Sequence, residues 1–271
     1  MTELGALVLA GGYGRRFQTG GKWRDKLLEV IGGKPLLLKT IEAVSEVSAE
    51  VVVATKPERA KAYSQVLGSK VKVVVDDPPT ASLLAGVRSG VKEMDAEYVL
   101  LIAGDMPYVR PEVIELLLRR IGSSDVAVPL WPDGRVEPLL TIYRREHLLE
   151  IIDMLGEERE RASDLIRGAN EAFFISVNEI RSVDYDLRSL KSINTPEDLR
   201  VKRLEVVGRA SSFSLRGHAD HFRRGLKAYS EGLYLEALKA FAKEAEVYRK
   251  YKLTHLEKHA MLDVRKCSER R

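Results

Sequence analysis

The residue types that suit phosphate chemistry stand near the start of the chain. An apolar run over residues 6–9 leads into a glycine-rich segment, residues 10–14, which is followed by Arg15 and Arg16. A strand that ends in consecutive glycines presents bare backbone N–H groups, and the arginines add positive charge. The segment predicts a nucleotide site. A glycine-rich turn without a ligand is the alternative that this loop alone leaves open.

Two better-known glycine loops fit the segment poorly. A Walker-type loop requires Gly-Lys-Ser/Thr at the start of a helix, whereas Gly14 is followed by Arg15 and Arg16. A dinucleotide fingerprint requires G-x-G-x-x-G and an acidic residue at the end of the next strand, and no acidic residue lies at 53–56. Neither loop is therefore favoured here.

A second chemical group follows another apolar run, in the segment Ala103-Gly104-Asp105-Met106-Pro107. A carboxylate at the carboxyl end of a strand is well placed to hold a hard divalent cation against phosphate oxygens. An ordinary turn, or a cap for a helix that begins at Pro111, is the alternative explanation of Asp105. Its metal role gains support only from the other motifs.

The elements that must position these groups alternate along the first 204 residues. Short apolar runs predict strands, and amphipathic stretches between them predict helices. Runs that are apolar on both faces favour a Rossmann-like, three-layer α/β/α fold with a mainly parallel sheet, whose ligands lie beyond the carboxyl ends of the strands. The expected strands are 6–9, 50–54, 71–75, 98–102 and 126–128, and the expected helices are 36–47, 57–67, 81–94 and 111–121.

Several motifs, in order along the chain, carry a family resemblance. Leu9-Ala10-Gly11-Gly12, Gly14, Arg16 and Asp25-Lys26 resemble the signature of the nucleotidyltransferases that make nucleotide-activated cofactors and sugars. Within that group the chain is similar to the molybdenum cofactor guanylyltransferase family. The later motifs that fit it are Gly104-Asp105, then Asp133-Gly134-Arg135 with Glu137-Pro138-Leu139, and finally Ile193-Asn194-Thr195-Pro196-Glu197-Asp198-Leu199.

The resemblance implies a nucleotide-diphospho-sugar transferase-like fold and a role for each matching residue. Arg16, Lys26 and Asp105 would be catalytic, and Asp105 would bind Mg²⁺. Asn194 would contact the phosphate acceptor. The residues that would bind the nucleotide are Leu9, Ala10, Gly11, Gly12, Gly14, Lys26, Thr55, Asp76 and Asp105.

The choice of base depends on the strip from Asp76-Asp77-Pro78-Pro79 to Leu84-Ala85-Gly86, which resembles the family's base-recognition segment. A carboxylate at Asp76 can accept both the N1–H and the exocyclic amine of guanine. Ser82-Leu83 stands where the family usually has Gly-Pro, and Thr55 stands where it often has Asn. The carboxylate at Asp76 favours GTP as the nucleotide. The departures at Thr55, Ser82 and Leu83 leave CTP as the alternative.

The predicted reaction is transfer of GMP from GTP to molybdopterin, with release of pyrophosphate. Adenosylcobinamide phosphate or a sugar phosphate is the alternative acceptor, because these motifs do not specify it. A hypothesis of a different class is a nucleotide-binding scaffold or regulatory protein, which would bind nucleotide without releasing pyrophosphate.

Residues 205–271 form a predicted helical extension, separate from a nucleotidyltransferase domain at 1–204. Glycine, aromatic and alanine positions between Gly225 and Phe241 match one tetratricopeptide-like hairpin. A single repeat cannot bury its own face, so it must pack on the first domain, on a protein partner or on a second copy. Serines at 211, 212 and 214 with Gly217 predict a linker before it.

The extension carries the net positive charge of the chain and four of its five histidines. It carries a net charge of +6 against −2 for residues 1–204, in accord with the total of +4. Both signs are interspersed, as on a solvated helix, so nucleic-acid binding is not expected. The pairs His218/His221 and His255/His259 could hold zinc or nickel only if they met, and solvated histidines are the simpler interpretation.

Composition sets further limits. The single cysteine, Cys267, excludes internal disulfides and a cysteine-based zinc site. No apolar run approaches the roughly 20 residues that span a bilayer, and no signal-peptide pattern precedes the first strand. The sequence predicts a cytoplasmic protein without a membrane partner.

Overall fold

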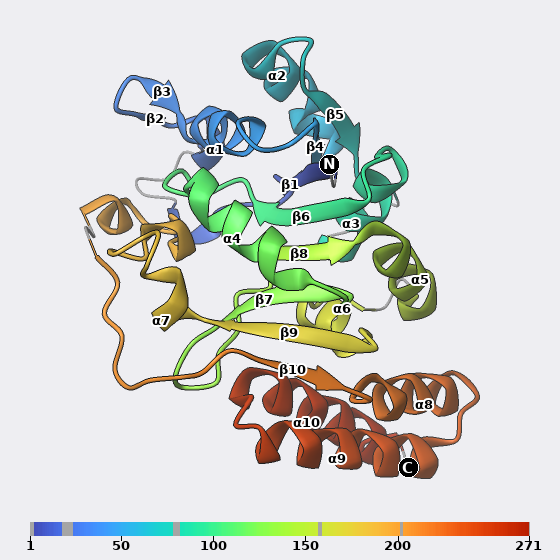
Figure 1. Cartoon of the computed structure of the whole chain (residues 1–271). Coiled ribbons are helices and arrows are strands. Elements are labelled where there is room, and N and C mark those ends of the chain that lie inside the picture. Colours follow the sequence, from blue (N-terminus) through green and yellow to red (C-terminus); the bar gives the residue numbers. More distant parts are fainter. Residues whose placement is uncertain (1–2, 18–23, 78–81, 157–158, 201–202, 271) are drawn as a thin grey trace.

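A mixed, mainly parallel sheet forms the centre of the computed structural model, which describes residues 3–17, 24–77, 82–156, 159–200 and 203–270 (Figure 1). Its eight strands run in the order β10-β9-β7-β8-β6-β1-β4-β5. β8 is antiparallel to both of its neighbours and β10 is antiparallel to β9, whereas the other pairs are parallel. The strands are β1 (Leu4–Leu9), β4 (Glu50–Thr55), β5 (Lys72–Val75), β6 (Tyr98–Ala103), β7 (Val126–Leu130), β8 (Leu140–Arg144), β9 (Glu171–Ser176) and β10 (Phe213–Arg216).

Two apolar cores, one on each face of the sheet, make the three predicted layers. Ala6 and Val8 of β1 belong to one core and Leu7 to the other, as the alternation of a buried strand requires. α1, α2, α4 and α7 contribute to the first core, and α3, α5 and α6 to the second. These helices are α1 (Leu36–Ser45), α2 (Pro57–Leu67), α3 (Leu83–Lys92), α4 (Pro111–Ile121), α5 (Arg145–Leu155), α6 (Ser163–Arg167) and α7 (Val177–Ile180); β2 (Val30–Ile31) and β3 (Lys34–Pro35) form a separate hairpin. The predicted fold class is confirmed.

The C-terminal region packs on this domain, and it begins with a strand of the same sheet. Phe213–Arg216 forms β10, so the interpretation of this serine-rich stretch as a linker is wrong. Leu215 is buried, and the Phe213 ring stacks on Phe174 of β9 at 5.2 Å between centroids. Ser214, between Phe213 and Leu215, is exposed on the outer face of the edge strand.

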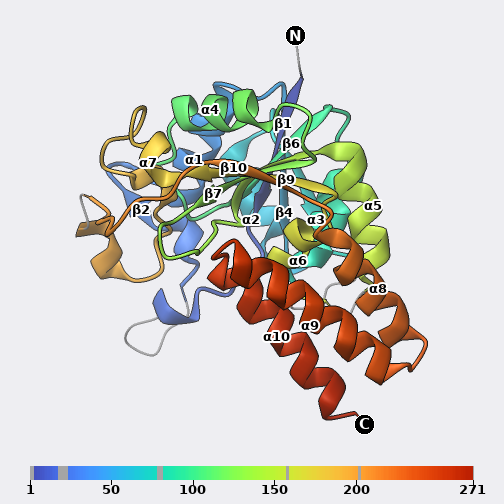
Figure 2. The ribbon, with the colours of Figure 1, turned by 60° about the horizontal axis from the view of Figure 1, so that its bottom comes forward.

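Three helices follow, where the sequence predicted a hairpin of two. They are α8 (Ala219–Ser230), α9 (Tyr234–Lys250) and α10 (Thr254–Ser268), and they lie together below the sheet (Figure 2). Gly225 of α8 allows the close approach of α9, because an added Cβ would lie 2.5 Å from the Phe241 ring. Across the described residues, no helix is both long and apolar enough to cross a membrane. Cys267 is buried as a free thiol in α10.

Candidate functional site

A cavity of about 380 Å³ opens at the carboxyl ends of β1, β4 and β6. It is where an open α/β sheet binds its ligands. Most of the predicted site residues meet there. The lining residues are Leu9, Ala10, Gly11, Gly12, Tyr13, Gly14, Arg16, Lys26, Leu27, Ala54, Lys56, Asp76, Ser82, Leu83, Gly86, Ala103, Asp105, Leu139 and Asn194.

The glycine loop is held from behind by Arg59 of α2. The Nη1 atom of Arg59 donates to the carbonyl oxygens of Gly12 at 2.7 Å and of Ala10 at 3.4 Å. Its guanidinium also lies over the Tyr13 ring, 5.2 Å from the centroid. Sequence reasoning missed this residue, because a basic residue inside an amphipathic helix looks like surface charge. Arg59 is instead buried. Its hydrogen bonds hold carbonyl oxygens of the loop, on the side that would face away from a bound phosphate.

Lys26 and Asp105 form an ion pair at the centre of the cavity, with 2.5 Å between Nζ and Oδ2. Asp25 positions Lys26 because it caps the short 3-10 helix η2 (Lys26–Leu28). One oxygen of Asp25 accepts from the Leu27 amide at 3.0 Å, and the other accepts from the Tyr63 hydroxyl at 2.8 Å. Lys26 therefore lines the cavity, and Asp25 holds the turn that positions Lys26.

Asp105 has the chemistry of a magnesium ligand. Its Oδ1 atom is buried and has no hydrogen-bond partner within the described parts of the chain. No group of three or more His, Cys, Asp or Glu side chains that could hold a metal occurs among the described residues. Because Mg²⁺ is commonly held by one or two carboxylates together with substrate phosphates and water, the single carboxylate fits such an ion.

Asp76 occupies the opposite wall of the cavity. Its Oδ2 atom pairs with Lys56 Nζ at 2.8 Å, and both side chains are buried. Its Oδ1 atom has no hydrogen-bond partner within the described residues. Gly11 and Gly86 flank the carboxylate, and an added Cβ would lie 2.9 and 3.0 Å from its oxygens. Sequence reasoning did not identify Lys56, which leaves one carboxylate oxygen, not two, for a base donor.

The closing motif lies across the cavity from the glycine loop. Arg16 Nη2 donates to Asn194 Oδ1 at 3.1 Å. Asp198 accepts from the backbone amides of Asn194 and Thr195, each at 2.8 Å. Burial opposes ionisation of Asp198, but the hydrogen bond from Lys191 and those two amides outweigh it and lower its pKa to about 2. The turn that carries Asn194 is thus held by a fixed negative charge.

One predicted nucleotide contact lies outside the cavity lining. Thr55 is fully buried, and its hydroxyl donates to the Ala10 carbonyl at 3.3 Å. It supports the glycine loop from beneath. Three parts of the motifs lie outside the described residues: Pro78-Pro79 of the base strip, residues 18–23 before Asp25, and the side chain of Arg15.

The Glu137-Pro138-Leu139 motif reaches the cavity through Leu139. Glu137 itself accepts a hydrogen bond from the Trp131 indole nitrogen at 2.6 Å. Burial raises the pKa of Glu137 to about 7, although that hydrogen bond opposes the change. The preceding turn at Gly134 touches the extension, where Thr254 donates to the Asp133 carbonyl at 2.7 Å.

Three of the four histidines in the two pairs, His218, His255 and His259, make packing or hydrogen-bond contacts. His218 Nε2 donates to the Ile166 carbonyl at 3.1 Å, and His259 Nδ1 lies 2.5 Å from the Ser163 hydroxyl. The His255 and His259 rings contact each other, with 4.7 Å between centroids. Burial lowers the pKa of both His218 and His259 to about 4. These neutral rings join the extension to the first domain.

Comparisons with known proteins show the family of the chain. The family model "MobA-like NTP transferase domain" matches residues 6–172. The chain is 34% identical over 210 residues to a probable molybdenum cofactor guanylyltransferase of Methanosarcina acetivorans, which covers 75% of this chain and 92% of that protein. A protein of the same description from Pyrococcus horikoshii is 31% identical over 204 residues, covering 73% and 98%.

A solved structure agrees as well. Molybdopterin-guanine dinucleotide biosynthesis protein A from Archaeoglobus fulgidus has a TM-score of 0.59 and 25% identity, and the match covers 72% of this chain and 95% of that one. The family model ends at residue 172, before α8, α9 and α10.

Proposed function

Because the chain belongs to the family of MobA-like NTP transferases, we propose that it transfers GMP from GTP to molybdopterin and releases pyrophosphate. The observation that carries the proposal is the Lys26–Asp105 pair between the glycine loop and the end of β6. A cation and a potential metal ligand would then face the same phosphates of a bound nucleotide. The relatives of this description support guanine as the base and molybdopterin as the acceptor.

In this reaction a phosphate oxygen of the acceptor attacks the α-phosphorus of GTP. A new P–O bond forms, the bond to the β-phosphate oxygen breaks, and pyrophosphate takes the electron pair. Bound Mg²⁺ would supply charge neutralisation on the triphosphate, with Asp105 as its protein ligand. Amides of the loop from Gly11 to Gly14 would hold the phosphates, and Arg16 and Lys26 would stabilise the leaving pyrophosphate.

The two remaining site residues select the substrates in this proposal. The unpartnered Oδ1 of Asp76 would accept one donor of guanine, since Oδ2 is already held by Lys56. Asn194, bonded to Arg16, would contact the acceptor. We assign catalysis to residues 1–204 and treat 205–271 as an extension. A cytoplasmic location, and a protein partner or self-association through the extension, stay predictions.

The test is pyrophosphate release with Mg²⁺ from GTP, CTP and ATP, each with and without molybdopterin. We expect release only with GTP and molybdopterin together, and a loss of at least about 100-fold in Asp105→Asn. Asp153→Asn, an exposed carboxylate of α5, is the matched control and should release at the wild-type rate. Tight GTP binding without release would point to another acceptor, and absence of nucleotide binding would favour the scaffold hypothesis.

A further inference from the structure

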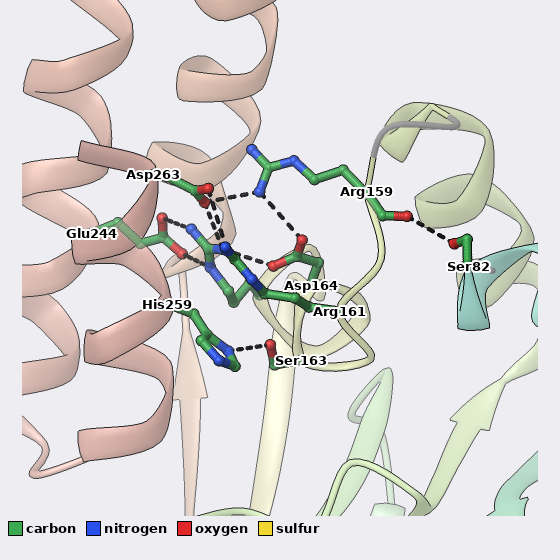
Figure 3. A network of polar contacts seen from close by, with 9 residues as sticks. Ser82, Arg159, Arg161, Ser163, Asp164, Glu244, His259 and Asp263 are labelled. Carbon is green, nitrogen blue, oxygen red and sulfur yellow. Dashed lines mark hydrogen bonds and ion pairs between the residues drawn. The ribbon is translucent and has the colours of Figure 1, made fainter. Parts of the chain in front are cut away.

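A buried ionic network joins the C-terminal helices to the first domain (Figure 3). Its centre is Arg167 of α6, whose side chain is fully buried. Two parallel hydrogen bonds of 2.7 Å connect it to Glu244 of α9. Its Nη1 atom donates to Asp164 at 2.7 Å and to Asp263 of α10 at 2.8 Å. The Phe222 ring lies 4.1 Å from the guanidinium carbon.

One member of this network continues toward the nucleotide cavity. Asp263 also accepts from Arg159 Nη1 at 2.8 Å, and Asp164 accepts from the same atom at 3.2 Å. The backbone carbonyl of Arg159 in turn accepts from the Ser82 hydroxyl at 3.1 Å. Arg159 therefore has its side chain held by the extension and its backbone bonded to a residue of the cavity (Figure 3).

Ser82 sets the position of the first turn of α3. Its hydroxyl oxygen accepts from the Leu84 amide at 3.2 Å, as the N-cap of that helix. Leu83 and Gly86 of the same helix line the cavity beside Asp76. A small displacement of Ser82 thus moves the wall against which a base would lie.

We propose that Asp263 is a positioning residue for nucleotide binding, which acts through Arg159 on Ser82 and the start of α3. The inference rests on the proposed function, because it assumes that GTP occupies this cavity. The extension then belongs to the nucleotide site, although none of its described residues lines the cavity. Asp263 should affect the binding of GTP far more than the chemical step.

The chain offers a matched pair of carboxylates that separates positioning from stability. Asp263 and Glu244 both bind buried Arg167, but only Asp263 binds Arg159. For Asp263→Asn we expect the KM and Kd for GTP to rise roughly 5- to 10-fold, with kcat within about 2-fold of wild type. Glu244→Gln should lower the unfolding temperature at least as much while leaving both constants for GTP unchanged.

Ser82→Ala tests the other end of the path and leaves the Arg167 network intact. It should raise the KM for GTP at least as much as Asp263→Asn does, because it also removes the N-cap of α3. The double variant with Asp263→Asn should raise the KM no further than Ser82→Ala alone, because both changes break one path. Equal increases in Asp263→Asn and Glu244→Gln, or multiplied effects in the double variant, would overturn the proposal.

Calorimetric titration with GTP and Mg²⁺ distinguishes this inference from the proposed function. If the wild-type chain does not bind GTP, the proposed function fails, and this inference fails with it. If the wild-type chain binds GTP and the Asp263→Asn and Ser82→Ala variants bind it equally well, only the positioning role is wrong.

Discussion

Two groups of charged side chains, one in the nucleotide cavity and one at the junction with the extension, are built in opposite ways. Asp76 and Asp105 in the cavity each pair with a lysine, yet each keeps one buried oxygen without a hydrogen-bond partner among the described residues. At the junction, Arg167 donates to three carboxylates and is completely enclosed. Because an unsatisfied buried acceptor costs about 1–3 kcal/mol, it persists where a ligand can satisfy it. The open group therefore has the chemistry of a ligand site. The closed group holds the extension on the first domain, and only its branch through Asp263 and Arg159 leads toward the cavity.

The largest expected effect is on the closed group. Arg167→Met should destabilise the protein by roughly 3–5 kcal/mol, since it leaves Glu244 and Asp263 buried without their shared cation. Urea unfolding measures the change. Adding Glu244→Met to this variant should recover part of the loss, because it removes one stranded carboxylate. A single variant as stable as the wild type would break the comparison.

The open group should respond in rate more than in stability. Lys26→Ala should lower kcat for pyrophosphate release about 100-fold, because the cation that faces the leaving group is lost. Because the Lys26–Asp105 pair is also largely buried, the free energy of unfolding of this variant should fall as well, but by less than in Arg167→Met, which removes a cation shared by three carboxylates. Lys34→Ala, an exposed lysine paired with Glu42, is the matched control and should keep full activity. Unchanged turnover in Lys26→Ala would remove that residue from the mechanism.

Acid should lower the stability of the folded chain through His218 at the junction. Burial lowers the pKa of His218 from 6.5 to about 4, so below pH 6.5 the unfolded chain binds a proton that the folded chain does not. This stability is complete above pH 6.5 and is lost as the pH falls toward 4, by roughly 2 kcal/mol at pH 5. Unfolding of His218→Gln as a function of pH should show a flatter slope. An equal slope in that variant and the wild type would contradict the assignment.

The smallest effect is expected at an ion pair that belongs to neither group. Arg249 and Glu257 of the extension are joined at 2.8 Å but exposed in part to solvent. Glu257→Gln should change the free energy of unfolding by less than about 0.5 kcal/mol and leave GTP turnover unchanged. Differential scanning calorimetry and the release assay measure the two quantities. A loss comparable to that of Arg167→Met would mean that burial does not explain the strength of the junction.

Local signals in the sequence predicted much of the first domain. α2 and α4 begin and end where expected, because a proline opens each helix and a glycine with positive φ follows it. β8 and β9 were missed because their short runs include polar and charged residues, such as Arg144 in β8 and Glu171 in β9. Their place in the sheet also depends on β7, with which both pair. The C-terminal edge strand, β10, was missed because its four residues form a strand by pairing with β9.

The candidate site also contains residues that the sequence predicted and residues that only the structure shows. Lys26 and Asp105 follow recognisable motifs, and the structure brings them together. Arg59 and Lys56 act from the start of α2, where only the folded chain shows what they contact. Arg167, Glu244 and Asp263 could not be paired in advance, because 77 and 96 residues separate the arginine from its two partners in the extension.

The pairing of β10 with β9 has a consequence for the solution behaviour of shorter chains. β9 would otherwise be the last strand of the sheet on that side. An edge strand with unpaired backbone groups is a template for aggregation. A chain cut at residue 204, the predicted domain boundary, would expose that template together with the apolar surface that Phe213 and Leu215 cover. The extension thus also protects β9 from pairing with a strand of another copy of the chain.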